Sequence, residues 1–247
     1  MTTIDLSGRT ALVTGAAQGL GAAIAAALHA AGASVAMLDR DADANARTAA
    51  EIGTRTTPIT ADLADPDQLD AAYRTVVERL GGVDILVNNA AVAPMTGLWD
   101  IPAQEWDTVF AVNVRAAFLL TRTAAHGMRE RGFGRIINIA SLSAQQPRPT
   151  GMHYGASKAA LIAMTRVFAK ELAADGITAN VIAPGMIETP MVHTIGARAM
   201  ADLAAAIPVG RIADPAEIAH LVTFLAGDGA GFITGATHDI NGGVLMR

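Results

Sequence analysis

The stretch "TALVTGAAQGLGAAIAAAL", residues 10–28, decides the fold class. It opens with a short run rich in apolar and β-branched residues, which predicts a buried strand over 10–15. Apolar residues then recur at helical spacing over 19–31. A glycine-rich turn between a strand and a helix lets the backbone approach a pyrophosphate at the helix N-terminus, so the stretch predicts a dinucleotide-binding unit. The glycines of this turn are Gly15, Gly19 and Gly21.

The same alternation of strand-like and helix-like segments continues along the chain. It predicts an α/β fold: a single-domain, Rossmann-type, doubly wound parallel sheet of about seven strands, with helices on both faces. Further strands are expected at 34–39, 57–62, 84–89, 134–141, 177–185 and 237–243. Helices are expected at 42–53, 66–80, 104–130, 154–174 and 213–227.

One segment breaks this alternation. Residues 186–212 form a long connection that follows the carboxyl end of a strand and is rich in Met and Ala. Long insertions at this place often close over a substrate, so we interpret the segment as a lid. No linker, repeat or low-complexity tract interrupts the rest, and we therefore expect one domain over 1–247.

Composition excludes several classes of function. Apolar residues make up 51% of the chain and charged residues 17%, enough for a large core. The net charge of −5 argues against nucleic-acid binding, and the lack of cysteine excludes disulfides and thiol chemistry. Polar and glycine interruptions of the apolar region 22–38 argue against a membrane span. No His, Asp or Glu cluster has the spacing of metal ligands. We expect a cytoplasmic protein without a metal site.

The end of the second strand bears on the choice of cofactor. Asp39 stands roughly 20 residues after the glycine turn, where the carboxylate of dinucleotide-binding folds accepts hydrogen bonds from ribose. It would repel the 2′-phosphate of NADP, whereas Arg40 beside it could pair with that phosphate. Gln18 in the turn adds no positive charge. We favour NAD(H) and leave NADP(H) open.

A possible acid–base pair lies in "MHYGASKAA", residues 152–160. Tyr154 and Lys158 stand four residues apart, so their side chains can share one helix face. A phenol is a poor base at neutral pH, but a nearby ammonium favours its ionised form. The pair could therefore exchange a proton with an alcohol or a carbonyl. Taken alone, this spacing also fits an ordinary helix start with two surface neighbours.

Two further polar residues strengthen the catalytic interpretation. Ser141 ends the strand expected at 134–141, and Tyr154 begins the next helix, so both should lie at the carboxyl edge of the sheet where ligands bind. The Ser141 hydroxyl could donate to a carbonyl oxygen. Asn113 lies within an apolar helical stretch, where a buried amide must find partners. It could also be an Asn that only bends its helix.

In combination, these motifs resemble the short-chain dehydrogenase/reductase family over essentially the full chain. The family pattern T-G-x-x-x-G-x-G runs from Thr14 to Gly21, and the acid after the third strand is Asp62. The family sequence N-N-A-G appears as "NNAA" at 88–91, with Ala91 in place of the glycine. This departure tightens the turn near the nicotinamide ribose without removing the binding residues.

The resemblance implies hydride transfer between a nicotinamide and a secondary alcohol or ketone. Tyr154 would be the general acid or base, Lys158 would hold the ribose and lower the phenol pKa, and Ser141 would orient the substrate oxygen. Asn113 would fix a water that links Lys158 to solvent. Cofactor contacts are implied for Gly15, Gln18, Gly19, Leu20, Gly21, Asp39, Arg40, Asp62, Leu63, Asn89, Ala90, Tyr154, Lys158, Pro184, Gly185, Ile187 and Thr189. Substrate contacts are expected for Ser141, Gln145, His153, Tyr154, Met186 and Met191.

Other functions remain open at this stage. The main alternative is an NADPH-dependent 3-oxoacyl-carrier-protein reductase or a broad ketone reductase, which Asp39 and the acidic pI of about 5.6 disfavour. Gln18 stands where the family's epimerases and dehydratases have glycine. A nucleotide-sensing protein without activity would commonly lack Tyr154 or Lys158, and both are present. The resemblance also implies a small-molecule substrate and a homotetramer.

Overall fold

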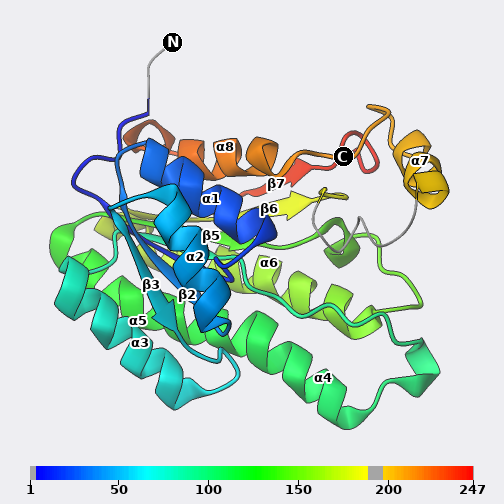
Figure 1. The fold of residues 1–247 in the computed structure, drawn as a ribbon, viewed down its shortest axis with the longest axis horizontal. Coiled ribbons are helices and arrows are strands. Elements are labelled where there is room, and N and C mark those ends of the chain that lie inside the picture. The colour runs from blue at the N-terminus through cyan, green and yellow to red at the C-terminus, as the bar shows by residue number, and fades with distance from the viewer. Residues whose placement is uncertain (1–3, 189–196, 247) are drawn as a thin grey trace.

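The computed structural model describes residues 4–188 and 197–246 and shows the expected doubly wound sheet (Figure 1). Seven parallel strands lie in the order β3-β2-β1-β4-β5-β6-β7, which confirms the predicted fold class. The expected strands are all present, and most end one to three residues earlier than predicted. They are β1 (Thr10–Thr14), β2 (Ser34–Asp39), β3 (Thr56–Thr60), β4 (Ile85–Asn88), β5 (Gly134–Ile139), β6 (Ile177–Pro184) and β7 (Thr237–Ile240).

Helices follow the strands, and two of them begin at the signals seen in the sequence. Asp65 caps the N-terminus of α3 by accepting from two backbone N–H groups, and Pro66 occupies the first turn. Asp214 and Glu217 form a reciprocal capping box at the start of α8. The helices are α1 (Gly19–Ala30), α2 (Ala42–Ile52), α3 (Pro66–Leu80), α4 (Ala103–Phe110), α5 (Ala116–Arg131), α6 (Met152–Leu172), α7 (Ala197–Ala205) and α8 (Pro215–Ala226).

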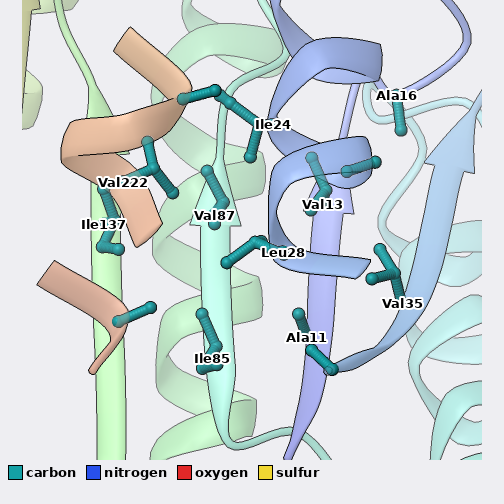
Figure 2. Close-up of a cluster of buried hydrophobic side chains, with 14 of the residues drawn as sticks. Ala11, Val13, Ala16, Ile24, Leu28, Val35, Ile85, Val87, Ile137 and Val222 are labelled. Atoms are coloured by element: carbon teal, nitrogen blue, oxygen red, sulfur yellow. The ribbon is translucent and has the colours of Figure 1, made fainter. Parts of the chain in front are cut away.

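Two apolar layers cover the two faces of the sheet. On one face, Ile24 and Leu28 of α1 and Val222 of α8 pack against Val13 of β1 and Val87 of β4 (Figure 2). On the other face, α3, α5 and α6 pack against the alternate residues of the same strands. Strands buried on both sides explain the nearly continuous apolar runs of the sequence.

One predicted helix is wrong in its continuity. The segment 104–130 is two helices, α4 and α5, joined by a π-helical turn over Ala111–Arg115. The π-helical turn holds one more residue than an α-helical turn, and residues 111–115 carry no Gly or Pro that would signal it. Asn113 lies in this turn and is buried. Another difference is that α6 begins at Met152, two residues before the predicted start.

The expected lid is described only in part. Within 186–212, helix α7 covers Ala197–Ala205, and a short parallel bridge joins Ile187 to Ala213. Thr189 and Met191, two of the predicted site residues, lie outside the described residues.

The topology fixes where a ligand can bind. From β1 the chain winds outward through β2 and β3, then crosses back to β4 on the other side of β1. Helices on either side of this reversal diverge, so a crevice opens at the carboxyl ends of β1 and β4. The glycine turn after β1 and Asn89 after β4 border this crevice. No helix of the described chain is long and apolar enough to cross a membrane.

Candidate active site

The glycine turn requires glycine for steric reasons. Gly15 has a positive φ of 66°, and a Cβ there would lie 2.9 Å from Cα of Ala90. A Cβ at Gly21 would come within 1.9 Å of the carbonyl oxygen of Gly15. The first turn of α1 therefore sits against the end of β1 at a distance that only glycine allows. Its free N–H groups lie at the crevice, as a pyrophosphate site requires.

A clamp between β1 and β4 holds this turn in place. Oγ1 of Thr14 accepts from the backbone N–H groups of Asn89 and Ala90, at 3.0 and 3.1 Å. Nδ2 of Asn89 donates to the carbonyl oxygens of Thr14 and Gly15, at 2.9 and 3.2 Å. The Asn89 amide group thus donates to the ends of β1 rather than into the crevice.

Asp39 ends β2 beside the glycine turn. Its Oδ2 accepts from the N–H of Ala17 at 3.0 Å, and its Oδ1 accepts from the N–H of Asp41 at 3.0 Å. These two bonds fix the carboxylate at the mouth of the crevice, and each oxygen keeps a lone pair for another donor. Arg40, the next residue, is exposed.

A cavity of about 400 Å³ lies along the carboxyl ends of β1 to β4. Its lining brings together ten residues predicted to contact a cofactor: Gly15, Gln18, Leu20, Gly21, Asp39, Arg40, Asp62, Leu63, Asn89 and Ala90. Sequence reasoning missed four other lining residues: Ala61, Ala91, Val92 and Val112.

Ala61 and Ala91 directly flank Asp62 and Ala90, and Val92 follows one residue later, so the motif boundaries could have indicated these three. Val112 comes from the π-helical turn and has no sequence signal. A neighbouring hollow of about 730 Å³ shares Gln18, Arg40, Ala91 and Val92 with this cavity and extends to Glu105 of α4.

Lys158 is buried at the end of β5. Its side chain is 1% exposed, and Nζ donates to the carbonyl oxygen of Ile139 at 2.7 Å. Burial lowers the pKa of Lys158 to about 7. The ammonium has three donors, and no other hydrogen bond of Nζ is present within the described chain. A buried cation with donors to spare is a suitable partner for hydroxyl groups of a ligand.

Tyr154 lies one helical turn before Lys158, with Nζ of the lysine 5.8 Å from the phenol ring centroid. Burial raises the pKa of Tyr154, and a side-chain hydrogen bond with Ser141 acts in the opposite direction. Ser141 follows β5, and its Oγ accepts from the N–H of Ser143 at 3.1 Å. The structure thus brings Ser141, Tyr154 and Lys158 together at the carboxyl end of β5.

Asn113 holds the loop after β4 to helix α6. Its Oδ1 accepts from the N–H of Val92 at 2.9 Å, and Nδ2 donates to the carbonyl oxygen of Val92 at 3.0 Å. The second proton of Nδ2 goes to Oγ of Ser157, also at 3.0 Å. Both donors of the amide are engaged with protein groups. The Asn113 side chain, which was expected to fix a water, therefore connects the π-helical turn, the loop after β4 and helix α6.

Two of the expected substrate contacts have other partners. Gln145 donates to Oδ1 of Asp239 in β7 at 2.7 Å. His153 is fully buried, and its Nε2 lies 3.1 Å from Oε1 of Glu105. With no exposed atom, His153 does not reach a substrate in this arrangement, and we do not assign it that role.

The residues after β6 lie outside the 400 Å³ cavity. Gly185 follows Pro184, the last residue of β6. Its N–H donates to the carbonyl oxygen of Ile240 in β7 at 3.0 Å, so the pairing of these two strands extends to this residue. Met186 lines a separate cavity of about 200 Å³ with residues near the C-terminus. Gly19 and Ile187 also do not line the main cavity. These positions can contact only a ligand that extends beyond it towards β6.

The residues present fit a dinucleotide. The approach of Gly21 to Gly15 leaves a cradle that a Cβ would fill, and Asp39 has lone pairs for ribose hydroxyls. At the other end, Lys158 has N–H donors without partners among residues 4–188 and 197–246. Within the described residues, no group of three or more His, Cys, Asp or Glu side chains could hold a metal ion.

Comparison with known proteins agrees with this geometry. The family model described as enoyl-(acyl carrier protein) reductase matches residues 15–245. Nodulation protein G of Rhizobium sp. (strain N33) is 40% identical over 98% of this chain and 99% of its own. Acetoacetyl-CoA reductase of Rhizobium meliloti (strain 1021) is 40% identical over 95% of this chain and 98% of its own.

Among solved structures, 3-ketoacyl-(acyl-carrier-protein) reductase from Brucella melitensis, complexed with NADH, superposes with a TM-score of 0.92. It is 34% identical, and the match covers 98% of this chain and 100% of that one. The chain belongs to the short-chain dehydrogenase/reductase family. It is accordingly an oxidoreductase of CH–OH and ketone groups that uses NAD or NADP, as the motifs indicated.

Proposed function

We propose that this short-chain dehydrogenase/reductase interconverts a small or medium-sized ketone and its secondary alcohol, with NAD(H) as the preferred cofactor. The observation that carries the proposal is the cluster of Tyr154, Ser141 and Lys158 at the carboxyl end of β5, beside the crevice. A nicotinamide, when bound, supplies or accepts the hydride at the substrate carbon.

The residues of the chain handle the proton. In reduction, Oη of Tyr154 gives its proton to the substrate oxygen as the carbon receives the hydride, and in oxidation it takes that proton back. Ser141 donates a hydrogen bond that holds the oxygen against the phenol. Lys158 offers its free N–H donors to ribose hydroxyls, and its charge favours the phenolate. Asn113 joins Ser157 to the loop at Val92 and so supports the first turns of α6.

Tyr154→Phe tests this assignment because it removes only the phenolic oxygen. We expect turnover to fall by about 10³-fold or more, since general acid–base catalysis is worth 10²–10⁴-fold. NADH binding, measured by the change in its fluorescence, should stay within about threefold of wild type. Turnover at the wild-type rate would refute the mechanism. Retained NADH binding with no wild-type activity on any ketone would favour the nucleotide-sensing alternative.

The preference for NAD(H) is supported by Asp39. Its carboxylate is held by Ala17 and Asp41 at the cavity, where a 2′-phosphate would meet a negative charge. The Brucella relative complexed with NADH is consistent with this preference. The competing feature is Arg40, which lines the same cavity. Steady-state kcat/KM with NADH and NADPH decides between them, and a tenfold advantage for NADPH would show that Arg40 dominates.

The second candidate is reduction of a 3-oxoacyl thioester. It is favoured by the names of two relatives, acetoacetyl-CoA reductase and 3-ketoacyl-(acyl-carrier-protein) reductase. A panel containing acetoacetyl-CoA, a small cyclic ketone and a linear 2-ketone, each with both cofactors, separates the candidates. A kcat/KM for the thioester at least 100-fold above that for the simple ketones would replace the first proposal with the second.

We also propose a homotetramer in the cytoplasm. Two separate exposed apolar areas could form two-fold interfaces. One carries Phe118 and Val167 on α5 and α6, and the other carries Phe224 and Phe232 near α8 and β7. Light scattering on size-exclusion fractions should give four times the chain mass of 25.3 kDa. A monomer at micromolar concentration would contradict the assembly.

A further inference from the structure

The residue before the proposed acid–base tyrosine is a buried histidine that the mechanism does not use. His153 is 0% exposed, although histidine is only intermediate among residues in its tendency to be buried. Neither ring nitrogen makes a hydrogen bond with the described residues. The nearest partner is the carboxylate of Glu105 in α4, whose Oε1 lies 3.1 Å from Nε2. That oxygen is also buried and has no hydrogen bond of its own.

Helix α6 presents this histidine and the tyrosine on neighbouring faces. His153 and Ser157 stand four residues apart and lie in one row, which faces α4 and the π-helical turn through Glu105 and Asn113. Tyr154 and Lys158 form the adjacent row, which faces the end of β5. The row of His153 and Ser157 makes contacts with other elements, whereas the row of Tyr154 and Lys158 holds the groups that act on the substrate.

The start of α6 has one other set of side-chain contacts on this side, in which Ser157 accepts from Asn113 and donates to the carbonyl oxygen of Tyr154. Gly151 precedes the helix in the left-handed conformation at φ 68°, and no side chain caps the first turn. The loop before it is joined to the rest by the backbone bridge between Gly97 and Thr150, by the bond from Gly151 N–H to the carbonyl oxygen of Thr96, and by the bond from Gln145 to Asp239. Tyr154 lies within this uncapped first turn. The contact between His153 and Glu105 joins the residue directly before Tyr154 to α4.

We infer that Glu105 and His153 are positioning residues that fix the first turn of α6 and thereby the place of the Tyr154 phenol. Glu105 acts on His153 by direct contact, and His153 acts on Tyr154 through the peptide bond that joins them. The inference rests on the proposed role of Tyr154 as general acid and base. A shift of about 1 Å in a reacting group can lower turnover about 100-fold, so such a contact would affect catalysis without touching the substrate.

Glu105→Ala and Glu105→Gln test the inference by kinetics. We expect the alanine variant to lose about 10- to 100-fold in kcat, with the KM for NADH within about twofold, because α1 and Asp39 are unaffected. The glutamine variant keeps the length of the side chain and an oxygen that can contact Nε2, and it should recover at least half of that loss on a logarithmic scale. Asp107→Ala is the matched control, because it removes an exposed carboxylate from the same helix. Its kcat should equal that of the wild type.

A second readout follows Tyr154 without any turnover. The chain has two tyrosines, Tyr73 and Tyr154, so Tyr73→Phe leaves Tyr154 as the only one. Labelling this protein with 3-fluorotyrosine gives one ¹⁹F resonance that reports on the phenol. We expect Glu105→Ala to shift, broaden or split this resonance, and Asp107→Ala to leave it unchanged. The His153→Leu variant should show the same change as Glu105→Ala.

The outcomes separate this inference from the proposed function. If Glu105→Ala lowers the melting temperature but keeps both kcat and the ¹⁹F resonance of its parent, the pair only stabilises the fold and the inference is wrong. If the wild type reduces no ketone while the resonance still depends on Glu105, the proposed function fails and the positioning of Tyr154 stands. A fall in kcat that glutamine does not restore, with an unchanged resonance, would also refute the inference.

Discussion

Strand β5 has a buried cation at each end, and the two differ in how their donors are satisfied. At its start, Arg135 is 4% exposed. Its guanidinium donates to the carbonyl oxygens of Gly134, Gly176 and Gly227, at 2.9, 3.3 and 3.4 Å. Its Cζ also lies 4.3 Å from the ring centroid of Phe133. The donors on Nε and Nη1 of this cation all have protein partners.

At the other end of the strand, Lys158 is as deeply buried but has one hydrogen bond, to Ile139. Burial lowers the pKa of both groups, for Lys158 to about 7. The difference lies in the partners, because a buried donor without an acceptor carries the full cost of its lost hydration. We infer that Arg135 serves stability, whereas Lys158 has donors reserved for a ligand. The predictions below test this contrast.

The largest effect is expected for Lys158→Met. Loss of the ammonium removes a ribose contact and the charge that favours the phenolate, so turnover should fall at least about 10²-fold. Steady-state kinetics with NADH and the best ketone of the panel measures it. Lys170→Met, at the chain's other lysine, is exposed on the same helix and should keep wild-type activity. If Lys158→Met keeps activity within threefold of wild type, the inferred difference between Lys158 and Arg135 is wrong.

Arg135→Met should have the opposite profile. It removes the hydrogen bonds from the guanidinium to three carbonyl oxygens and the stacking on Phe133, at a cost of about 2–4 kcal/mol in the free energy of unfolding. Urea unfolding measures this cost. The kcat of the folded variant should stay within about twofold of wild type. A variant that keeps its stability but loses turnover would show that Arg135 belongs to the site.

The pH dependence of stability should separate the two cations further. Between pH 7 and about 10, Lys158 is largely deprotonated in the folded apoprotein but protonated in the unfolded chain. The unfolded state binds more protons there, so this group makes stability rise with pH, by up to about 1.4 kcal/mol per unit. Urea unfolding at pH 7, 8 and 9 should show this rise as a difference between wild type and Lys158→Met. Parallel curves would contradict it.

The smallest effect is expected for Asp228→Asn. Asp228 is 79% exposed and lies 3.5 Å from Nη2 of Arg9, whose Cζ lies 3.5 Å from the ring centroid of Phe133. Exposed ion pairs of this kind contribute less than about 1 kcal/mol. The melting temperature should therefore move by no more than about 2 °C. A larger loss would show that Arg135 depends on this carboxylate for its stability.

The fold could be predicted from the sequence because its signals are local. Buried parallel strands are short apolar runs that end at polar residues such as Asp39, and Pro66 and Pro215 each follow a capping Asp. The π-helical turn within 104–130 was not predicted, since residues 111–115 contain no Gly or Pro that would signal a departure from α-helical geometry. The early start of α6 was missed because Gly151, in the left-handed conformation, is not a standard N-cap.

The residues of the candidate site that belong to sequence motifs could be predicted. Ser141, Tyr154 and Lys158 come together as expected, although their roles stay predictions until the variants are measured. The hydrogen-bond partner of each polar side chain could not be predicted from the sequence. Gln145 bonds to a residue 94 positions away, and Asn113 to one 21 positions away, and no local pattern encodes either distance. A histidine fits the wall of a substrate pocket as well as a buried contact between helices, so the sequence does not distinguish these two places for His153.

The hydrogen bond from Lys158 depends on the unequal lengths of two strands. The ladder between β4 and β5 ends at the pair Asn88 and Asn138, and the N–H of Ala90 turns away to Thr14. The carbonyl oxygen of Ile139 therefore has no partner in this ladder, and Nζ of Lys158 donates to it instead. The ammonium is therefore preorganised as an extension of the sheet. Its rotamer entropy is lost when the chain folds, so ligand binding need not order this side chain again.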